Sequence, residues 1–171
     1  TPTLSATAQP SQEPALAAFD QGVAGYLALR HEIERHTAAP RESDDPDEFM
    51  RAGLALAEAM AAARAAAATG DVLTLEVGIM LRQRLERTMQ TAHLRTAELL
   101  ADCDEVKKGV VRDLVVNDVF PWAWTTDMPG ILIDALPALP KQLQFRLVGS
   151  SLVVTDIDTD LIVDILPDAL P

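Results

Sequence analysis

Two histidines near residue 31 come close to the spacing of a zinc-binding helix. They stand at the ends of the segment His31-Glu32-Ile33-Glu34-Arg35-His36. A zincin motif places its histidines four residues apart, so that both project from one face of a helix and share the metal. In this chain they are five residues apart, which separates them by about 140° around a helix. The spacing favours a solvated helix end over a metal site.

A run of alternating acids near the C-terminus has the residue types of a calcium loop. Asp156, Asp158 and Asp160 stand at every second position. Calcium loops also use alternate oxygen ligands, but an EF-hand needs Gly at its sixth position and Glu at its twelfth. Counted from Asp156, the sequence meets neither requirement. Two interpretations stay open: a solvated turn whose acids cap local N–H groups, and a weak calcium site formed by these three residues.

Three of the seven aromatic residues, including both tryptophans, stand in one short segment, Phe120-Pro121-Trp122-Ala123-Trp124. As an exposed loop it would be the leading candidate for a partner-binding site, with Phe120, Trp122 and Trp124 as contacts, because tryptophan is enriched at binding hot spots. As a buried plug it would join the sheet to the helices, because large aromatic side chains bury much area per residue. The pattern favours the plug and leaves the loop open.

Other side chains that do chemistry lack an activating context. Cys103 stands between two aspartates at the expected end of a helix, and both features disfavour a thiolate. His93 falls on the apolar stripe of that helix, as a hydrogen-bonded boundary residue would. The sequence has no G-x-S-x-G nucleophile elbow, no Walker phosphate loop and no dinucleotide fingerprint. These absences disfavour an enzyme, and no cofactor is predicted.

Composition excludes several further classes. The chain has 171 residues and a formal net charge of −12, with 14 Lys and Arg against 26 Asp and Glu. Nucleic-acid binding depends on basic side chains that neutralise phosphates, so this charge disfavours it. No apolar run approaches the roughly 20 residues that span a bilayer. A single cysteine excludes an intrachain disulfide framework.

The first two thirds of the chain predict helices. Residues 1–12 are rich in Thr, Ser, Ala and Pro and are expected to be a disordered lead. Apolar residues then recur with the helical period of 3.6. Three helices are expected at about residues 13–37, 46–68 and 74–102, within a helical part that covers residues 13–104. Asp45-Pro46 offers an N-cap followed by proline at the first helical position of the second helix.

Residues 105–171 change to the alternation of strands. Pro129 begins a short helix near residues 129–136, and Gly149-Ser150 is a candidate two-residue hairpin turn. Strands are expected at residues 143–148, 152–156 and 161–166, with residues 110–116 as a possible fourth. The chain is therefore predicted to be an α+β protein, in which a three-helix layer packs on a small antiparallel sheet of three or four strands.

The last 36 residues, LPALPKQLQFRLVGSSLVVTDIDTDLIVDILPDALP, resemble the C-terminal region of a group of uncharacterised, exported bacterial proteins. In that group an Ala-rich helical half precedes the same ending, and the link Gly70–Thr74 is similar too. The resemblance implies an exported α+β protein and carries no activity. It makes Gly149 the turn glycine and Asp156 and Asp164 recurring strand-end acids, while Asp160 stands where the group has Asn.

Two functions follow as hypotheses. The first is a non-enzymatic exported protein, periplasmic or secreted with its signal peptide removed, that acts as an interaction or structural module. It would bind a protein partner or associate with itself. The second is a calcium-dependent binding protein or hydrolase that uses the C-terminal acids.

Overall fold

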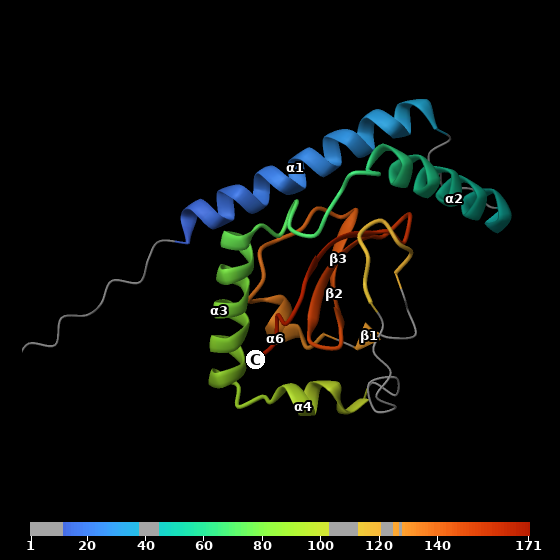
Figure 1. The fold of residues 1–171 in the computed structure, drawn as a ribbon. Helices are drawn as coiled ribbons and strands as arrows, with labels where there is room; N and C mark the ends of the chain where they lie inside the picture. The colour runs from blue at the N-terminus through green and yellow to red at the C-terminus, as the bar shows by residue number, and fades with distance from the viewer. Residues whose placement is uncertain (1–11, 38–44, 103–112, 121–124, 127) are drawn as a thin grey trace, which may run out of the picture.

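The computed structural model describes residues 12–37, 45–102, 113–120, 125–126 and 128–171. Its helical elements are α1 (Glu13–His36), α2 (Pro46–Ala63), α3 (Leu75–Thr91), α4 (Thr96–Leu99), the 3-10 turn η1 (Leu100–Asp102) and α6 (Gly130–Ile133). Its strands are β1 (Thr125–Thr126), β2 (Leu143–Val148), β3 (Ser151–Asp156) and β4 (Ile162–Leu166). The predicted α+β fold, with helices first and an antiparallel sheet at the end, is confirmed (Figure 1).

α1 carries a basic residue on its buried stripe. Phe19, Val23 and Tyr26 are buried at spacings of four and three residues, as the helical period requires. Arg30 continues the stripe four residues after Tyr26 and is only 4% exposed. A buried arginine needs a charged partner, so α1 must meet an acid on the element that covers it.

α2 begins as the sequence predicts and ends earlier than expected. The Asp45 carboxylate accepts the N–H of Asp47 at 3.0 Å, with Pro46 at the first helical position. The helix stops at Ala63 rather than near residue 68. Arg64 follows outside helical geometry and is buried, with its guanidinium directed to the sheet. This tertiary contact overrides the good helix propensity of the alanines after it.

α3 also ends before its expected limit, at Thr91 rather than Asp102. His93 takes a left-handed backbone with φ 54°. Its N–H reaches the carbonyl of Gln90 at 3.2 Å, and the N–H of Leu94 reaches that of Met89 at 2.9 Å, which is a Schellman termination. His93 is thus an exposed helix terminator, and its predicted place on a buried stripe is wrong.

The sheet is antiparallel throughout, in the order β1-β2-β3-β4. Gly149 and Ser150 form the predicted hairpin turn between β2 and β3, with Gly149 at φ 56°. The fourth strand is β1, which pairs with Leu147 and Val148. Residues 113–116, which were expected to lie in that strand, form none, and residues 110–112 lie outside the described residues. A strand of two residues is too short to show an alternation of apolar and polar side chains, so the sequence does not predict β1.

Each face of the sheet has its own apolar cover. The inner face packs against α1, α2 and α3, and an ideal Cβ at Gly78 of α3 would lie 2.8 Å from Leu166 of β4. The outer face packs against Val116 and Phe120. Figure 1 shows this arrangement, with α3 on one side of the sheet and residues 113–120, in yellow, on the other.

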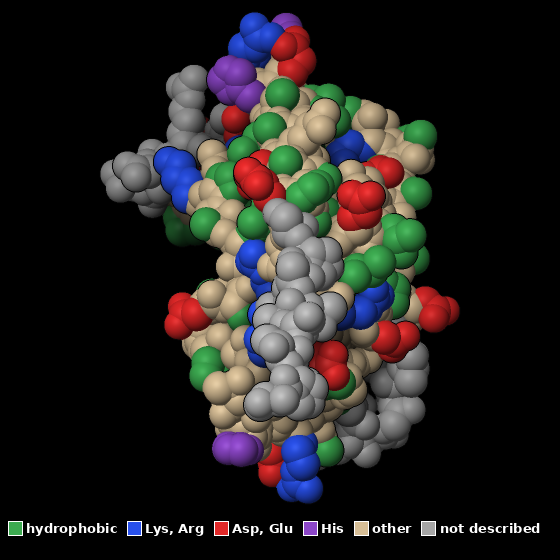
Figure 2. Space-filling view, turned by 90° about the vertical axis from the view of Figure 1, so that its left-hand side faces the viewer, with side chains coloured by type: hydrophobic (Ala, Val, Ile, Leu, Met, Phe, Trp, Pro, Cys, Tyr) green, Lys and Arg blue, Asp and Glu red, His purple; other side chains and the backbone are tan. Residues whose placement is uncertain are grey.

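Charges of both signs share the molecular face that Figure 2 presents. Red, blue and green side chains alternate there without a broad field of one colour. The net charge of −12 is therefore not gathered into one acidic patch on this face.

Candidate functional site

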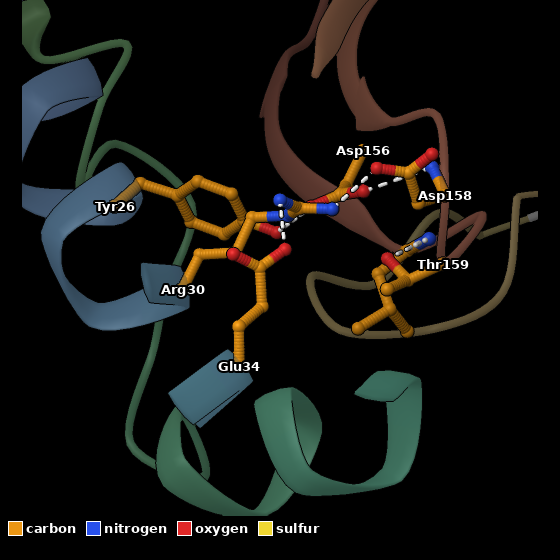
Figure 3. Close-up of polar contacts among 7 residues, drawn as sticks. Tyr26, Arg30, Glu34, Asp156, Asp158 and Thr159 are labelled. Atoms are coloured by element: carbon orange, nitrogen blue, oxygen red, sulfur yellow. Dashed lines mark hydrogen bonds and ion pairs between the residues drawn. The ribbon is translucent and has the colours of Figure 1, made fainter. Parts of the chain in front are cut away.

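The guanidinium of Arg30 gathers three carboxylates from two ends of the chain (Figure 3). Its Nε donates to Asp156 Oδ2 at 2.8 Å. Its two terminal nitrogens form ion pairs with Glu34, one turn further along α1, and with Asp158, in the turn after β3. Asp156 is fully buried. We call these four residues, together with Tyr26, the Arg30 cluster.

Tyr26 supplies a second donor to the buried carboxylate. Its hydroxyl donates to Asp156 Oδ2 at 2.8 Å, and the backbone N–H of Asp158 donates to Oδ1 at 3.0 Å. Burial, and then the charge of Asp156 and the hydrogen bond to it, raise the pKa of Tyr26 well above its ordinary value of 10.0. The phenol therefore stays protonated, and it acts as a fixed donor rather than as an acid or base.

Two of the three predicted calcium ligands, Asp156 and Asp158, belong to this cluster, where they bind an arginine. Asp156 and Asp158 are brought together, but the cation between them is the guanidinium of Arg30. Asp160 takes a left-handed backbone, with φ 55°, and its carbonyl accepts the N–H of Phe120 at 2.7 Å. Within the described ranges, no group of three or more His, Cys, Asp or Glu side chains is placed to hold a metal ion.

A second buried carboxylate, that of Asp164, holds the link between α2 and α3. Its Oδ1 accepts the N–H of Gly70 at 2.8 Å, and its Oδ2 accepts those of Val72 and Leu73 at 2.7 Å each. The N–H of Ile165 adds a fourth donor at 2.7 Å. The Asp164 carboxylate is thus the acceptor for backbone N–H groups of the turn between α2 and α3, which would otherwise be buried without a hydrogen bond.

Arg64 and Asn117 form a third polar contact between the two halves of the chain. The guanidinium donates to the Asn117 side-chain oxygen and to the Val163 carbonyl, at 2.8 Å each. The Asn117 amide donates back to the Arg64 carbonyl at 2.6 Å. The guanidinium carbon also lies 5.0 Å from the centre of the Tyr26 ring, within the range of a cation–π contact.

A hollow of about 690 Å³ lies beside β2. It is lined by Met128, by Ile133 and Asp134 at the end of α6, by residues 136–139 and by residues 143–146. Ligand sites in proteins commonly have volumes of about 300–1,000 Å³. The hollow is thus large enough for several side chains, and both apolar and charged groups line it.

The lining of this hollow places it along the edge of β2 that faces away from β3. Consecutive side chains of a strand point to opposite faces of the sheet, so residues 143–146 can line one space only along the side of the strand. The other side of β2 is paired with β3 along its whole length. On the hollow's side, β1 reaches only Leu147 and Val148 in the described part of the chain.

The ladder ends where the hollow begins. If β1 continued, Met128 would lie opposite Phe145, but Met128 is not in a strand and lines the hollow instead. Residues flanking a two-residue hairpin turn form a hydrogen-bonded pair, and such pairs then alternate along the strands. The turn at Gly149-Ser150 therefore directs the N–H and C=O of Phe145 away from β3, toward the hollow.

The remaining predicted site residues do not meet in one place. Phe120 is 2% exposed and packs on the outer face of the sheet, so it is not available to a partner. Trp122, Trp124 and Cys103 lie outside the described residues. His31 and His36 are exposed at the end of α1, where His36 Nε2 lies 3.2 Å from Glu32 Oε1.

Sequence reasoning missed the Arg30 cluster and the hollow. Arg30 had a signal, because it stands on the apolar stripe of its helix. Asp164 had one too, because it interrupts the apolar strand Leu161–Leu166 and needs a partner there. No sequence signal indicates the hollow, because it depends on the residue at which β1 stops pairing with β2.

No protein-family model, curated protein or solved structure that was compared matches this chain. None of the described helices combines the length and the apolar character that a membrane crossing requires.

Proposed function

We propose that the chain is an exported, non-enzymatic interaction module that binds an extended peptide segment as an added strand along β2. The observation that carries this proposal is the hollow over the edge of β2 at Phe145, which no described strand residue pairs with on the side away from β3. The N–H of the neighbouring Leu143 donates to the Pro140 carbonyl at 2.9 Å. Peptides that add to a sheet edge gain affinity from main-chain hydrogen bonds and specificity from pockets that receive alternate side chains. This edge offers both features.

The polar clusters support a non-enzymatic role because structural contacts occupy their reactive groups. Arg30 is held by carboxylates, and Asp164 by backbone N–H groups. Asp156 and Asp164 are fully buried, so neither carboxylate can reach a substrate without local unfolding. A general acid or base must come within hydrogen-bond reach of the proton that it transfers.

The lining indicates the chemistry of the bound segment. Leu143 and Phe145 face the inner side of the sheet, and Ile133 and Met128 add apolar surface to the hollow. Gln144 and Arg146 face the outer side and are joined by a hydrogen bond of 2.8 Å. A segment with apolar residues at every second position and polar residues between them fits this edge.

Selection of binders from a displayed library of random short peptides tests the binding surface, and α6 provides a matched pair of variants. Ile133 and Ile131 are 52% and 46% exposed, and only Ile133 lines the hollow. We expect selected peptides to shift the amide resonances of residues 143–146. Ile133→Asp should weaken binding at least about tenfold, which corresponds to about 1.4 kcal/mol, and Ile131→Asp should leave it unchanged.

Two outcomes would overturn this binding surface. One is that peptides bind with equal affinity to both aspartate variants, which would place their site elsewhere. The other is that no peptide binds at all. A dimer in native mass spectra, lost in Ile133→Asp and kept in Ile131→Asp, would make a second copy of the chain the partner at the same edge.

The export part of the proposal rests on the resemblance of the last 36 residues to exported bacterial proteins. Fractionation of cells that make the protein from its natural gene tests it. We expect the chain in the periplasm or the medium. Its recovery with the cytoplasmic fraction would overturn the export proposal and leave the binding surface untouched.

A further inference from the structure

We infer that the exposed first half of α2 is a second docking surface, which receives an amphipathic helix of a partner protein with basic residues at both ends of its apolar stripe. This inference goes beyond the proposed function, because no residue of α2 lines the hollow. It is carried by three large apolar side chains that the fold leaves exposed, by the acids beside them and by the place where α2 meets the rest of the molecule.

The first turns of α2 extend beyond the core. The buried residues of this helix begin at Gly53. An ideal Cβ at Gly53 would lie 3.1 Å from the Asp158 carbonyl oxygen, so α2 meets the turn between β3 and β4 there. Residues 46–51 are all exposed, and Figure 1 shows this end of α2 extending past the strands. The core therefore covers α2 only from its third turn onward.

Three large apolar side chains stand on this exposed part of the helix. Phe49, Met50 and Leu54 are 46%, 60% and 64% exposed. Phe49 lies four residues before Gly53, so it continues the stripe that is buried further along α2. Met50 and Leu54 are four residues apart and form the next ridge beside that stripe. Apolar residues scattered singly over a surface are ordinary, whereas a contiguous group is typical of an interaction surface.

Acids stand at both ends of the ridge formed by Met50 and Leu54. Asp47 lies three residues before Met50, and Glu58 lies four residues after Leu54, so these side chains share one side of the helix. Both acids are exposed, and they stand about 16 Å apart along the helix axis. α2 and its N-cap contain four acids and one base, Arg51, whose Nε donates to the Asp47 carbonyl at 3.1 Å. The ridge is thus apolar in its middle and negative at its ends.

The chemistry of this surface identifies the kind of partner. Within a helix the backbone N–H and C=O groups are paired with each other, so the side of α2 offers a partner only side chains. A partner helix pairs its own backbone in the same way, and its ridges can pack beside Met50 and Leu54. Basic residues at both ends of its apolar stripe would pair with Asp47 and Glu58. The net charge of −12 also attracts a basic helix from a distance.

The same charges disfavour a second copy of this chain as the occupant. Each copy carries a net charge of −12, and a two-fold contact uses the same patch on both copies. Antiparallel pairing of two α2 helices about the midpoint between Met50 and Leu54 would place Asp47 of one copy opposite Glu58 of the other. Like charges placed opposite each other destabilise a contact, so a basic partner fits this surface better.

A displayed library of short amphipathic helices, selected on the full chain, tests this inference. Every member has leucines along one face, and Lys, Glu and Gln are varied at the positions that flank this face. We expect selection to enrich lysine at pairs of positions about eleven residues apart, the separation of Asp47 and Glu58. The selected helices should shift the amide resonances of residues 47–58.

Two pairs of variants locate the surface. Leu54→Asp should weaken binding of the selected helices at least about tenfold, whereas Leu75→Asp, at a leucine of α3 that is 78% exposed, should leave it unchanged. Glu58→Lys should change the preferred residue at one flanking position from lysine to glutamate, and Glu86→Lys on α3 should not. All four side chains are exposed, so the variants should fold like the unaltered chain, which thermal melts check.

The inference is overturned if no helix is selected, if the selected helices show no preference for lysine, or if they bind Leu54→Asp and Leu75→Asp equally. A dimer in native mass spectra that only Leu54→Asp abolishes would also overturn it, because the occupant would then be a second copy. So would binding to phosphatidylcholine vesicles that only Leu54→Asp abolishes, since the surface would then meet lipid.

The two binding surfaces are separated by exchanging their variants. Leu54→Asp should keep the affinity of the peptides selected for the edge of β2, and Ile133→Asp should keep the affinity of the selected helices. Loss of helix binding in Leu54→Asp with no peptide bound at β2 removes the proposed function and leaves this inference standing. The reverse result removes the inference alone.

Discussion

Arg30 is the residue on which the buried charge of Asp156 depends. Removing one partner of a buried ion pair costs about 3–5 kcal/mol, because the remaining charge has no counter-ion. Asp156 is fully buried, and Arg30 is its counter-ion. We therefore expect Arg30→Met to lower the free energy of unfolding by about 3–5 kcal/mol in urea titrations.

The same helix offers a control for this substitution. Arg35 is exposed and forms a surface ion pair with Glu32, so Arg35→Met should change stability by less than about 1 kcal/mol. The double variant Arg30→Met with Asp156→Asn should recover part of the loss, because it removes the stranded charge. Equal costs for Arg30→Met and Arg35→Met would contradict the counter-ion role.

Tyr26 makes stability depend on pH in the alkaline range. Because its pKa is raised in the folded chain, the folded state keeps the phenol proton above pH 10, where the unfolded chain releases it. This contribution is fully present below pH 10 and is lost as the pH rises toward the raised pKa, at about 1.4 kcal/mol per pH unit. Urea titrations above pH 10 should therefore show a steeper loss of stability in the unaltered chain than in Tyr26→Phe.

The chain contains a single tyrosine, so ultraviolet absorbance of tyrosinate reports Tyr26 alone. We expect no tyrosinate signal near pH 10 in the folded chain and a normal titration in urea. Titration of the folded chain near pH 10 would show that Tyr26 does not donate to Asp156.

At the scale of elements, Asp164 fixes how α2 and α3 are joined. Hydrogen bonds to a charged group contribute about 1.5–3 kcal/mol, and a buried N–H left without an acceptor costs about 1–3 kcal/mol. Asp164→Asn replaces one acceptor oxygen by a donor, so we expect a loss of about 3 kcal/mol and faster hydrogen exchange at Val72 and Leu73.

Asp168→Asn is the matched control, because Asp168 is exposed and asparagine tolerates its left-handed backbone at φ 47°. It should change stability by less than about 0.5 kcal/mol. If both asparagine variants lose the same stability, or if Val72 and Leu73 exchange at the original rate in Asp164→Asn, the link is held by other contacts.

The sequence predicts the elements of this fold better than their ends. The starts of α2 and α3 follow from Asp45 and Thr74, whose side chains accept local N–H groups. The ends depend on contacts that propensity does not contain. Arg64 leaves α2 to reach Val163, and His93 adopts a backbone that usually calls for glycine. Local patterns cannot show either event, because the first is a tertiary contact and the second opposes residue preference.

At the scale of the whole molecule, calcium should have no effect on stability. Asp156 and Asp158 already have a cation in Arg30. A site with a dissociation constant of about 1 mM would add about 1.4 kcal/mol at about 10 mM calcium, which raises the melting temperature of a chain this long by several degrees. Thermal melts with calcium and with chelator should coincide. A rise that Asp158→Asn abolishes would restore the calcium-binding hypothesis.

The α+β class follows from the change of period along the sequence, but the candidate site does not. The hydrophobic alternation predicts β2, β3 and β4, and their inner face is buried as expected. The sequence pattern of the acids in the β3–β4 turn predicts either a solvent-facing turn or a metal site. Their partner is instead an arginine more than 120 residues earlier, and no local pattern joins Arg30 to Asp156.

The contact between Arg30 and Asp156 also has a consequence for synthesis. These residues are 126 positions apart, so α1 leaves the ribosome long before the strands that cover it. At about 5–20 residues per second, the interval is about 6–25 s. Throughout that time the apolar stripe of α1 has no sheet to pack on, which gives chaperones a window in which to hold the nascent chain.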